Sequence, residues 1–446
     1  MIILRIALRN LIQSRRRTSL LIAAIGTVTA FLVILLSISR GISDNLVDSA
    51  TTLSAGHVNV AGFYKVTASE PAPIVTNKES LKALIVENTE GIDYVTDRHR
   101  GWGKIISSTQ SVQAGLTGID LEQEPRFADQ LRLAPESAYY DGGSDEPVGD
   151  LTKLSDPNTL MLFEDQARRL GLRVGDLVTI QTETLSGRTN TIDVTLVAVA
   201  EDLGLLSSWV AIVPKSTIFE LYQLNEDTTG AIWIYLKDIN QAEAKMREVR
   251  TMLAENGYQV MDHEPLPFFM KFESVAGEDW TGQKLDVTVW KDEVSYLLWV
   301  LTTFDSVTWF LVAILVAIIA VGIMNTMWNS VRERTREIGT MRAMGMQRGR
   351  VLRLILLEAA LLGFAASTLG SLVGAGFALG ADAMEISVPI EAFKVILLAD
   401  TFRFSVHAGV LVAAVVVLSM FTTLAAAWPA VRAARLRPIT AIQHVD

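Results

Sequence analysis

Four stretches of this 446-residue chain are apolar and uncharged over lengths that can cross a membrane. About twenty such residues, wound as a helix, span the roughly 30 Å of bilayer hydrocarbon. The pattern therefore predicts an α-helical membrane protein with four transmembrane helices and a very long gap between the first two. The windows are residues 18–39, 306–331, 359–381 and 404–431, the last with His407 as its only possible proton carrier.

The long gap has the mixed periodicity of a large α+β domain. Helical patterns at residues 78–88 and 241–256 are each followed by a strand pattern, at 92–95 and 258–261, and these units predict two halves of one discontinuous subdomain. The patterns between them predict a second subdomain, at about residues 120–230, inserted into the first. They are strands at 112–118, 177–184, 190–200 and 209–213, a helix at 163–171, and an exposed loop rich in Gly, Pro and acid at 134–151.

The two apolar windows that flank this domain continue without proline, over residues 18–53 and 295–331. Continuous helices of these lengths would measure about 54 and 55 Å at 1.5 Å per residue. Each exceeds the hydrocarbon thickness by roughly 20 Å. We therefore expect both helices to continue beyond the membrane as a stalk.

The distribution of arginine predicts the orientation of the chain. Before the first window lie five arginines and no acid, and the tail holds Arg432, Arg435 and Arg437. Residues 332–353 hold seven arginines and two glutamates, whereas residues 380–404 have two bases against four acids. Because Lys and Arg collect on the cytoplasmic side, both termini and the 332–353 loop should face the cytoplasm, as in a bacterial inner membrane. Ser37-Ile38-Ser39 resembles a signal-peptide cleavage site, but the apolar core is too long for one.

The long insert is acidic, and the rest of the chain is basic. Residues 40–295 contain 22 Lys+Arg against 40 Asp+Glu, whereas the remainder contains 17 against 9. An acidic exported domain argues against a nucleic-acid partner and favours solubility beside an anionic membrane surface. Cysteine is absent, so we expect this extracytoplasmic domain to depend on core packing rather than disulfides.

No catalytic pattern is present in the sequence. The five histidines are scattered without metal-ligand spacing, no nucleophile elbow occurs, and no Walker motif is present. We therefore predict a non-enzymatic chain without cofactor or metal, which cannot bind ATP through a Walker motif of its own. Gly370 and Gly374 form a G-x-x-x-G in the third window and predict close helix packing. Glu358 could be a proton site, but a structural, helix-paired carboxylate is favoured.

The charged loop between the second and third windows has more pattern than topology requires. On a helix, Arg332, Glu333, Arg336 and Glu337 alternate charges at i, i+3 and i+4 spacing. Apolar residues and glycines are interspersed. A loop that only sets membrane orientation needs a few arginines and nothing else. We therefore favour a protein-docking role; the apolar positions are Ile338, Met341 and Met344, and the glycines are Gly339 and Gly345.

The stretch "ERTREIGTMRAMGMQRGRV" resembles the signature of MacB/FtsX-type ABC transporter permeases, E-R-x-x-E-I-G-x-x-R-A-x-G, which follows their second span. "IALRNLIQSRRRT" resembles the family's amphipathic N-terminal helix, and "TLMLFEDQARRLGLRVGDLVTI" resembles an exported helix and strand of lipoprotein-releasing and MacB permeases. "WPAVRAARLRPITAI" resembles the C-terminal ending. The signature positions are Glu333, Arg334, Glu337, Ile338, Gly339, Arg342, Ala343 and Gly345, and those of the ending are Pro429, Ala433, Ala434 and Pro438.

Two features depart from the family. MacB proteins carry a fused ATPase, which these 446 residues do not contain, and residues 265–293 match no part of the family that we can assign. The resemblance therefore implies a permease subunit whose separate cytoplasmic ATPase dimer pushes on the segment from Arg332 to Gly345. It also implies a second permease copy or a paralogue.

The same resemblance implies transport of lipoproteins, lipids or hydrophobic compounds on the far face of the membrane, with a periplasmic adaptor as a further possible partner. Few intramembrane charges are present to line a pore for small ions. One alternative is an FtsX-like regulator that transmits ATP-driven motion to an exported cell-wall hydrolase, and another is a sensor without an ATPase. The expected divisions are 1–17, 18–53, 54–294, 295–331, 332–353 (ATPase coupling), 354–381, 382–403, 404–431 and 432–446.

Overall fold

The computed structural model describes residues 2–67, 71–124, 127–386, 388 and 401–435. It separates into two compact units. The helical unit comprises Met1–Asp44, Leu301–Ser387 and Thr401–Asp446. The α/β unit comprises Asn45–Val300 and Val388–Asp400.

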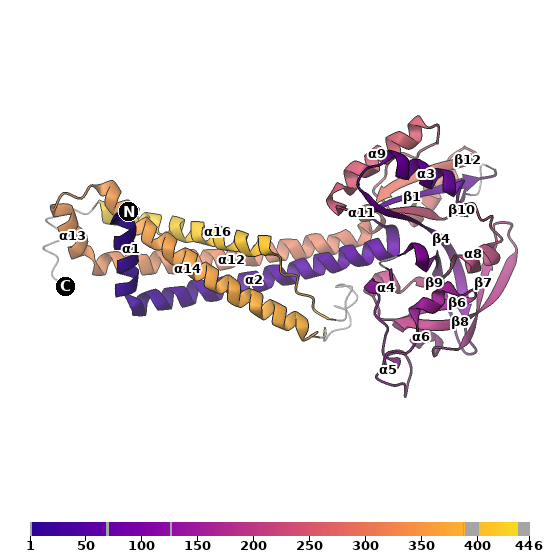
Figure 1. Cartoon of the computed structure of the whole chain (residues 1–446), viewed down its shortest axis with the longest axis horizontal. Coiled ribbons are helices and arrows are strands. Elements are labelled where there is room, and N and C mark those ends of the chain that lie inside the picture. The colour runs from indigo at the N-terminus through magenta and orange to yellow at the C-terminus, as the bar shows by residue number, and fades with distance from the viewer. Residues whose placement is uncertain (1, 68–70, 125–126, 387, 389–400, 436–446) are drawn as a thin grey trace. The chain divides into compact units, whose positions relative to one another are not determined.

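Among the described residues, four helices are long and apolar enough to cross a membrane, which confirms the four predicted spans. Two of them, α2 and α12, run without interruption beyond the limits of the helical unit. Side chains of all four long helices meet in one apolar cluster. Figure 1 shows the four helices as long ribbons. The helices are α1 (Ile2–Gln13), α2 (Arg15–Ala50), α12 (Ser295–Glu333), α13 (Thr335–Ala343), α14 (Arg348–Ala383), α16 (Ala408–Ala425) and α17 (Ala427–Ala434).

Small residues let α14 approach its neighbours closely. A Cβ at Gly370 would collide with the backbone of Gly26 on α2, and one at Gly374 would lie 2.7 Å from the carbonyl oxygen of Ala30. The structure thus places both glycines of the G-x-x-x-G at a helix crossing, where backbone contact is possible only without a side chain.

The α/β unit is built on one mixed sheet in the order β12-β1-β11-β4-β5-β9-β6-β8-β7. The unit has two halves, one with β12, β1 and β11, and one, the inserted half, with β5, β9, β6, β8 and β7. Strand β4 is long and belongs to both halves. Its first part, to Arg98, pairs with β11, and its second part, from His99, pairs with β5. The strands are β1 (Val58–Lys65), β4 (Ile92–Ile106), β5 (Ser111–Ile119), β6 (Thr159–Phe163), β7 (Leu177–Glu183), β8 (Thr189–Ala200), β9 (Val210–Pro214), β11 (Ala231–Leu236) and β12 (Gly282–Val289), with short β2 (Pro71–Ala72), β3 (Val75–Thr76) and β10 (Thr228–Thr229).

The inserted half closes on itself, because β7 also pairs with the end of β4. The six strands β4, β5, β9, β6, β8 and β7 therefore form a ring around an apolar core, into which α6 (Glu164–Leu170) and α8 (Lys215–Tyr222) also pack. The other half has a second core around Phe63, Trp233 and Phe268, and it carries α3 (Lys78–Asn88) and α9 (Ala242–Glu255). Each half thus has an apolar core of its own, and the shared strand β4 joins the two halves into one sheet.

The predicted strand at residues 258–261 is wrong. Only Val260 makes a bridge, to Leu285 of β12. Strand β12 instead takes the whole length of β1 as its partner. The chain after Met261 leads to Pro265 and Pro267, which cannot donate backbone hydrogen bonds to a ladder.

Residues 265–293, which sequence patterns left unassigned, supply an edge strand and the entry to α12. They form η5 (Phe268–Lys271), α10 (Phe272–Gly277), β12 and α11 (Trp290–Glu293). The predicted loop at 134–151 contains one helical turn, α5 (Glu136–Tyr139), whose Tyr139 is buried. The remaining short elements are η1 (Thr51–Ala55), η2 (Leu121–Gln123), α4 (Phe127–Gln130), η3 (Leu151–Ser155), α7 (Gly204–Ser207) and η4 (Ile239–Gln241).

Candidate functional site

The charged loop is a short helix, α13, set between the ends of two long ones. Helix α12 ends at Glu333, Arg334 breaks the helical run, and α13 begins at Thr335. Gly345 follows α13 with a φ of 95°, a conformation that favours glycine. Its amide donates to the Arg342 carbonyl, so the glycine ends the helix and turns the chain toward α14.

One face of α13 is packed inward. Ile338 and Gly339 are buried, and Ile338 joins a cluster with Val351 of α14 and Ala430 of α17. Arg342 reaches α17, where its Nη1 donates to the Ala434 carbonyl at 2.9 Å. These contacts fix the orientation of α13 on the helices beside it.

Arg334 also points inward, toward a buried carboxylate. Its Nη1 lies 3.3 Å from Oε2 of Glu358 on α14, and Glu358 also accepts a hydrogen bond from Asn10 of α1. Glu358 is only 7% exposed. The two contacts agree with the interpretation of Glu358 as a structural carboxylate that links α1, α14 and the start of α13.

The opposite face of the segment is exposed. It carries charges of both signs and one large apolar side chain, Met344, which is 76% exposed. The nine residues predicted to couple to an ATPase therefore divide into two sets. Arg334, Ile338, Gly339 and Arg342 face inward, whereas Arg332, Glu333, Glu337, Ala343 and Gly345 are exposed. Pro438 of the C-terminal motif lies outside the described residues, as does most of 382–403.

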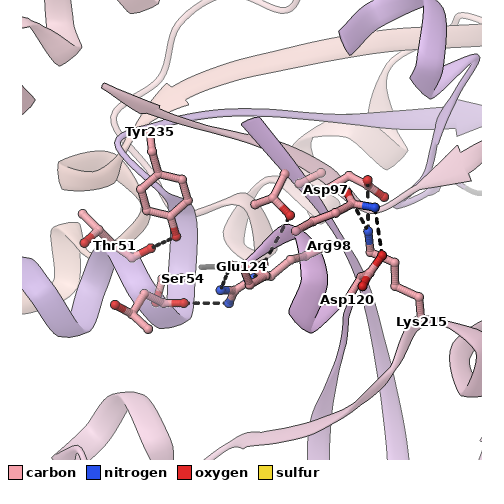
Figure 2. A network of polar contacts seen from close by, with 12 residues as sticks. Thr51, Ser54, Asp97, Arg98, Asp120, Glu124, Lys215 and Tyr235 are labelled. Atoms are coloured by element: carbon pink, nitrogen blue, oxygen red, sulfur yellow. Dashed lines mark hydrogen bonds and ion pairs between the residues drawn. The ribbon is translucent and has the colours of Figure 1, made fainter. Parts of the chain in front are cut away.

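A second cluster, which we call the helix junction, holds the end of α2 in the α/β unit. Helix α2 continues into η1, a single π-helical turn. The carbonyls of Thr51 and Thr52 accept hydrogen bonds from Tyr235 Oη at 2.9 Å and Arg98 Nη1 at 2.6 Å (Figure 2). The carbonyl of Ser54 accepts one from Arg100 Nη2 at 3.1 Å. The last carbonyls of a helix lack partners within it and form the negative end of its dipole, so two guanidinium groups complement them.

Arg98 is itself held by a buried ion pair. Its Nε and Nη2 donate to the two carboxylate oxygens of Glu124 at 2.6 and 2.9 Å, and its guanidinium lies 3.9 Å from the ring centroid of Trp233. Burial disfavours the charge, but Glu124 outweighs burial and raises the pKa of Arg98. The fork geometry fixes the direction in which Arg98 reaches η1.

Arg100 links the end of α2 to the start of α12. Its Nη2 lies 3.3 Å from Asn59 Oδ1, and Asn59 Nδ2 donates to Glu293 at 3.2 Å. Glu293 is the last residue of α11, two residues before α12, and it also accepts from Thr288 at 2.8 Å. Burial raises the pKa of Glu293, and Arg100 partly opposes this effect. One buried polar network therefore holds both chain segments where they enter the sheet.

Beside the junction, Asp97 of β4 is surrounded by three lysines. Lys215, Lys82 and Lys78 place their Nζ atoms 3.1, 3.0 and 3.6 Å from its carboxylate. Burial alone would raise the pKa of Asp97, but the three lysines together hold it well below its usual value. Because two of the lysines lie on α3 and one on α8, this carboxylate joins a helix of each half to the shared strand.

The sequence did not indicate the junction. Its only signal is "DRHR" (97–100), which places charged side chains inside a strand pattern. Their partners, Glu124 and the carbonyls of η1, lie 26 and 46 residues away. Within the described ranges, no three His, Asp or Glu side chains converge as ligands of a metal ion would.

Residues 309–438 match the FtsX-like permease C-terminal family. This match covers α13, most of α12 and the helices that follow, including the residues that hold α13 in place. The C-terminal membrane part of the chain is therefore an FtsX-like permease domain.

Curated relatives extend the comparison. An uncharacterized ABC transporter permease of Methanocaldococcus jannaschii is 23% identical over 381 residues, which are 83% of this chain and 82% of that protein. The macrolide export ATP-binding/permease protein MacB of Nitrobacter winogradskyi is 38% identical over 124 residues, 27% of this chain and 17% of that protein. The pyoverdine export ATP-binding/permease protein PvdT of Pseudomonas fluorescens is 35% identical over 123 residues, which are 27% of this chain and 16% of that protein. The chain thus matches about a sixth of the length of the ATP-binding/permease relatives.

Two solved structures are similar at low scores. The periplasmic region of MacB from Actinobacillus actinomycetemcomitans is 14% identical, with a TM-score of 0.31, over 57% of this chain and 97% of that one. The extracellular domain of YknZ from Gram-positive bacteria is 13% identical, with a TM-score of 0.29, over 44% of this chain and 94% of that one. Residues 309–438 thus match the FtsX-like permease C-terminal family, and the chain is similar to ABC transporter permeases such as MacB.

Proposed function

We propose that this chain is the membrane subunit of a transporter in which a separate ATPase dimer drives movements of the α/β unit, on the far side of a bacterial inner membrane. The observation that carries the proposal is the division of α13 into two faces. The inward face is fixed by Ile338, Arg334 and Arg342, so the exposed face cannot turn independently of α14 and α17. A partner that pushes on the exposed face would therefore move helices rather than a loose loop.

Helix α12 connects α13 to the α/β unit without a break in the helix. Only Arg334 separates α13 from α12, which runs for 39 residues. Such a helix is about 58 Å long at 1.5 Å per residue. At its other end, Val294 and α11 lead to Glu293 of the helix junction. A displacement of α12 would thus reach the network that also holds the end of α2.

The proposed cargo is a lipoprotein, a lipid or a hydrophobic compound. The four apolar windows carry almost no ionisable groups that could line a path for small ions. Two relatives are named for the export of pyoverdine and of macrolides, which supports export of organic molecules as the class of activity. Homodimers and pairs with a paralogue both fit this proposal.

Purification from native membranes tests the proposal. The tagged chain, extracted in mild detergent, should carry a second protein that contains a Walker motif, and the complex should hydrolyse ATP. The chain freed of that protein should not hydrolyse ATP, because its 446 residues contain no Walker sequence. Hydrolysis by the isolated chain, or repeated isolation without an ATPase, would refute the proposal.

A further inference from the structure

The α/β unit contains a cavity of about 540 Å³ beside the middle of strand β4. It lies where the partners of β4 change. Strand β11 pairs with β4 as far as Arg98, and β7 pairs with it from Lys104. No described strand pairs on that side with the residues between them, so the sheet has a notch there.

Two side chains replace the missing strand at the notch. The backbone amide of Trp102 donates to Tyr222 Oη at 2.7 Å. The Trp102 carbonyl accepts from Tyr222 Oη at 2.6 Å and from Thr182 Oγ1 at 2.5 Å. The amide and carbonyl of Trp102 therefore have hydrogen-bond partners. The space beside them stays open, because two side chains occupy less room than a strand.

The glycines on either side of Trp102 are required by this arrangement. A Cβ at Gly101 would collide with the ring of Tyr222, and one at Gly103 would lie 2.8 Å from Leu116 in the core of the strand ring. Trp102 itself points away from that core and is 57% exposed. A side chain of this size, exposed in the wall of a cavity rather than buried, is available for a ligand to stack on.

The cavity wall combines apolar surface with a positive balance of charge. Its charged groups are two cations and one carboxylate, and amides of two glutamines lie among them. Its volume falls in the range that holds a drug-sized ligand, about 300–1,000 Å³. The apolar lining includes Ile74, Trp102, Leu185 and Phe272, and the polar lining includes Arg100, Lys104, Gln113, Gln181 and Glu183.

We propose that this cavity binds an amphipathic organic anion. The apolar body of the ligand stacks on Trp102, and its acid group faces Lys104, which is exposed on the same strand two residues further on. An aromatic acid satisfies both requirements, because the ring contacts the indole and the carboxylate pairs with the ammonium group. Binding at this cavity does not depend on the proposed transport role and can be measured without the ATPase.

The experiment uses the full chain in lipid nanodiscs and two water-soluble probes of equal size, 2-naphthoate and the neutral 2-naphthamide. Saturation-transfer NMR reports binding, with empty nanodiscs as the blank. The wild-type chain should bind naphthoate saturably and naphthamide several-fold more weakly. Absence of saturable naphthoate binding up to about 10 mM, a Kd range in which even weak sites are occupied, would overturn the proposal.

Matched variants locate the site. Trp102→Ala should weaken naphthoate binding about tenfold or more, since ring contacts dominate such sites. Trp209→Ala is the control, because Trp209 is 56% exposed but does not line the cavity. Lys104→Gln should weaken naphthoate several-fold and leave naphthamide unchanged. Equal loss in the Trp102 and Trp209 variants, or equal effects of Lys104→Gln on both probes, would refute the assignment.

Discussion

Arg334 and Glu358 form an ion pair, with Nη1 3.3 Å from Oε2, between the start of the charged segment and the first half of α14. A residue of the segment that we propose to couple to an ATPase therefore makes a contact inside its own helical unit. In our proposal some residues of this segment hold α13 in place, and others form its exposed outer face.

The first prediction concerns this ion pair. Glu358→Gln should lower the melting temperature of the full chain in detergent by several degrees, because Arg334 loses its buried partner; such losses cost about 1–3 kcal/mol. Glu337→Gln removes the other partner of Arg334, but Glu337 is 69% exposed, so we expect a cost below about 1 kcal/mol. Equal shifts for the two variants would show that Glu358 does not anchor the segment.

The second prediction concerns the exposed face of α13. Glu337→Lys should abolish transport and the stimulation of ATP hydrolysis. Membrane insertion should stay normal, because the loop remains net basic and the contacts of Ile338, Arg342 and the Arg334–Glu358 pair are kept; only the exposed Arg334–Glu337 pair is lost. Glu255→Lys, at the exposed end of α9, makes the same change in charge and should be neutral. Normal transport by the Glu337→Lys variant would mean that the segment only sets the orientation of the chain in the membrane.

The third prediction concerns the helix junction. Arg98→Met leaves the buried Glu124 with only a long hydrogen bond from Thr96, at 3.4 Å, and frees the Thr52 carbonyl; breaking such a buried ion pair costs about 3–5 kcal/mol. Deuterium uptake by the backbone amides of residues 51–55 should rise in this variant. Arg173→Met removes an ion pair whose arginine is 46% exposed and should change stability by less than about 1 kcal/mol. Unchanged uptake in 51–55 would mean that Arg98 does not hold η1.

The fourth prediction concerns the continuity of α12. A proline at Leu298 removes a helix hydrogen bond and costs about 3 kcal/mol or more. We expect Leu298→Pro to keep ATP hydrolysis in the complex and to lose the output, whereas Leu298→Ala keeps both. Spin labels on the α/β unit give the readout: distances that are the same without nucleotide and with ATP trapped, in the wild-type complex, would contradict transmission through this helix.

The fifth prediction concerns pH and Asp202. Burial, with the charges of Glu164 and Asp165, raises the pKa of Asp202 from 3.8 to about 7. The folded chain therefore binds a proton between these values that the unfolded chain releases, so this carboxyl makes stability fall as pH rises from about 4 to about 7. Asp202→Asn should be more stable than wild type at pH 8 and show a smaller change in melting temperature between pH 5 and 8. Asp141→Asn, in an exposed loop, is the control; identical pH profiles for wild type and Asp202→Asn would disprove the shift.

Sequence patterns predicted the elements whose periodicity is local. The four spans, α3, α9 and the strands β5, β7, β8 and β9 lie close to their predicted positions. Strands β6 (TLMLF) and β11 (AIWIYL) were missed because they are apolar at nearly every position and have no alternation to detect. Both are buried throughout, as such a pattern requires.

The junction and the inward set of α13 could not be predicted, for a different reason. In the sequence, Arg98 does not differ from other charged residues, because Glu124 and the end of α2 contact it only in the folded chain. Arg334 likewise does not differ from its exposed neighbours, because its partner Glu358 is distant in the sequence. Spacing in the sequence indicates which residues share a helix face. It does not indicate which face another element covers.

The sharing of strand β4 limits how the α/β unit of this chain can be divided. Residues 99–106 complete the six-stranded ring, and residues 92–98 of the same strand form part of the neighbouring sheet. Residues 120–230 alone lack β4 and β5, two strands of the ring, so in another protein that segment would have an open wall and a core exposed to water. A viable chimera must therefore include the whole of β4 together with its three neighbours, β5, β7 and β11.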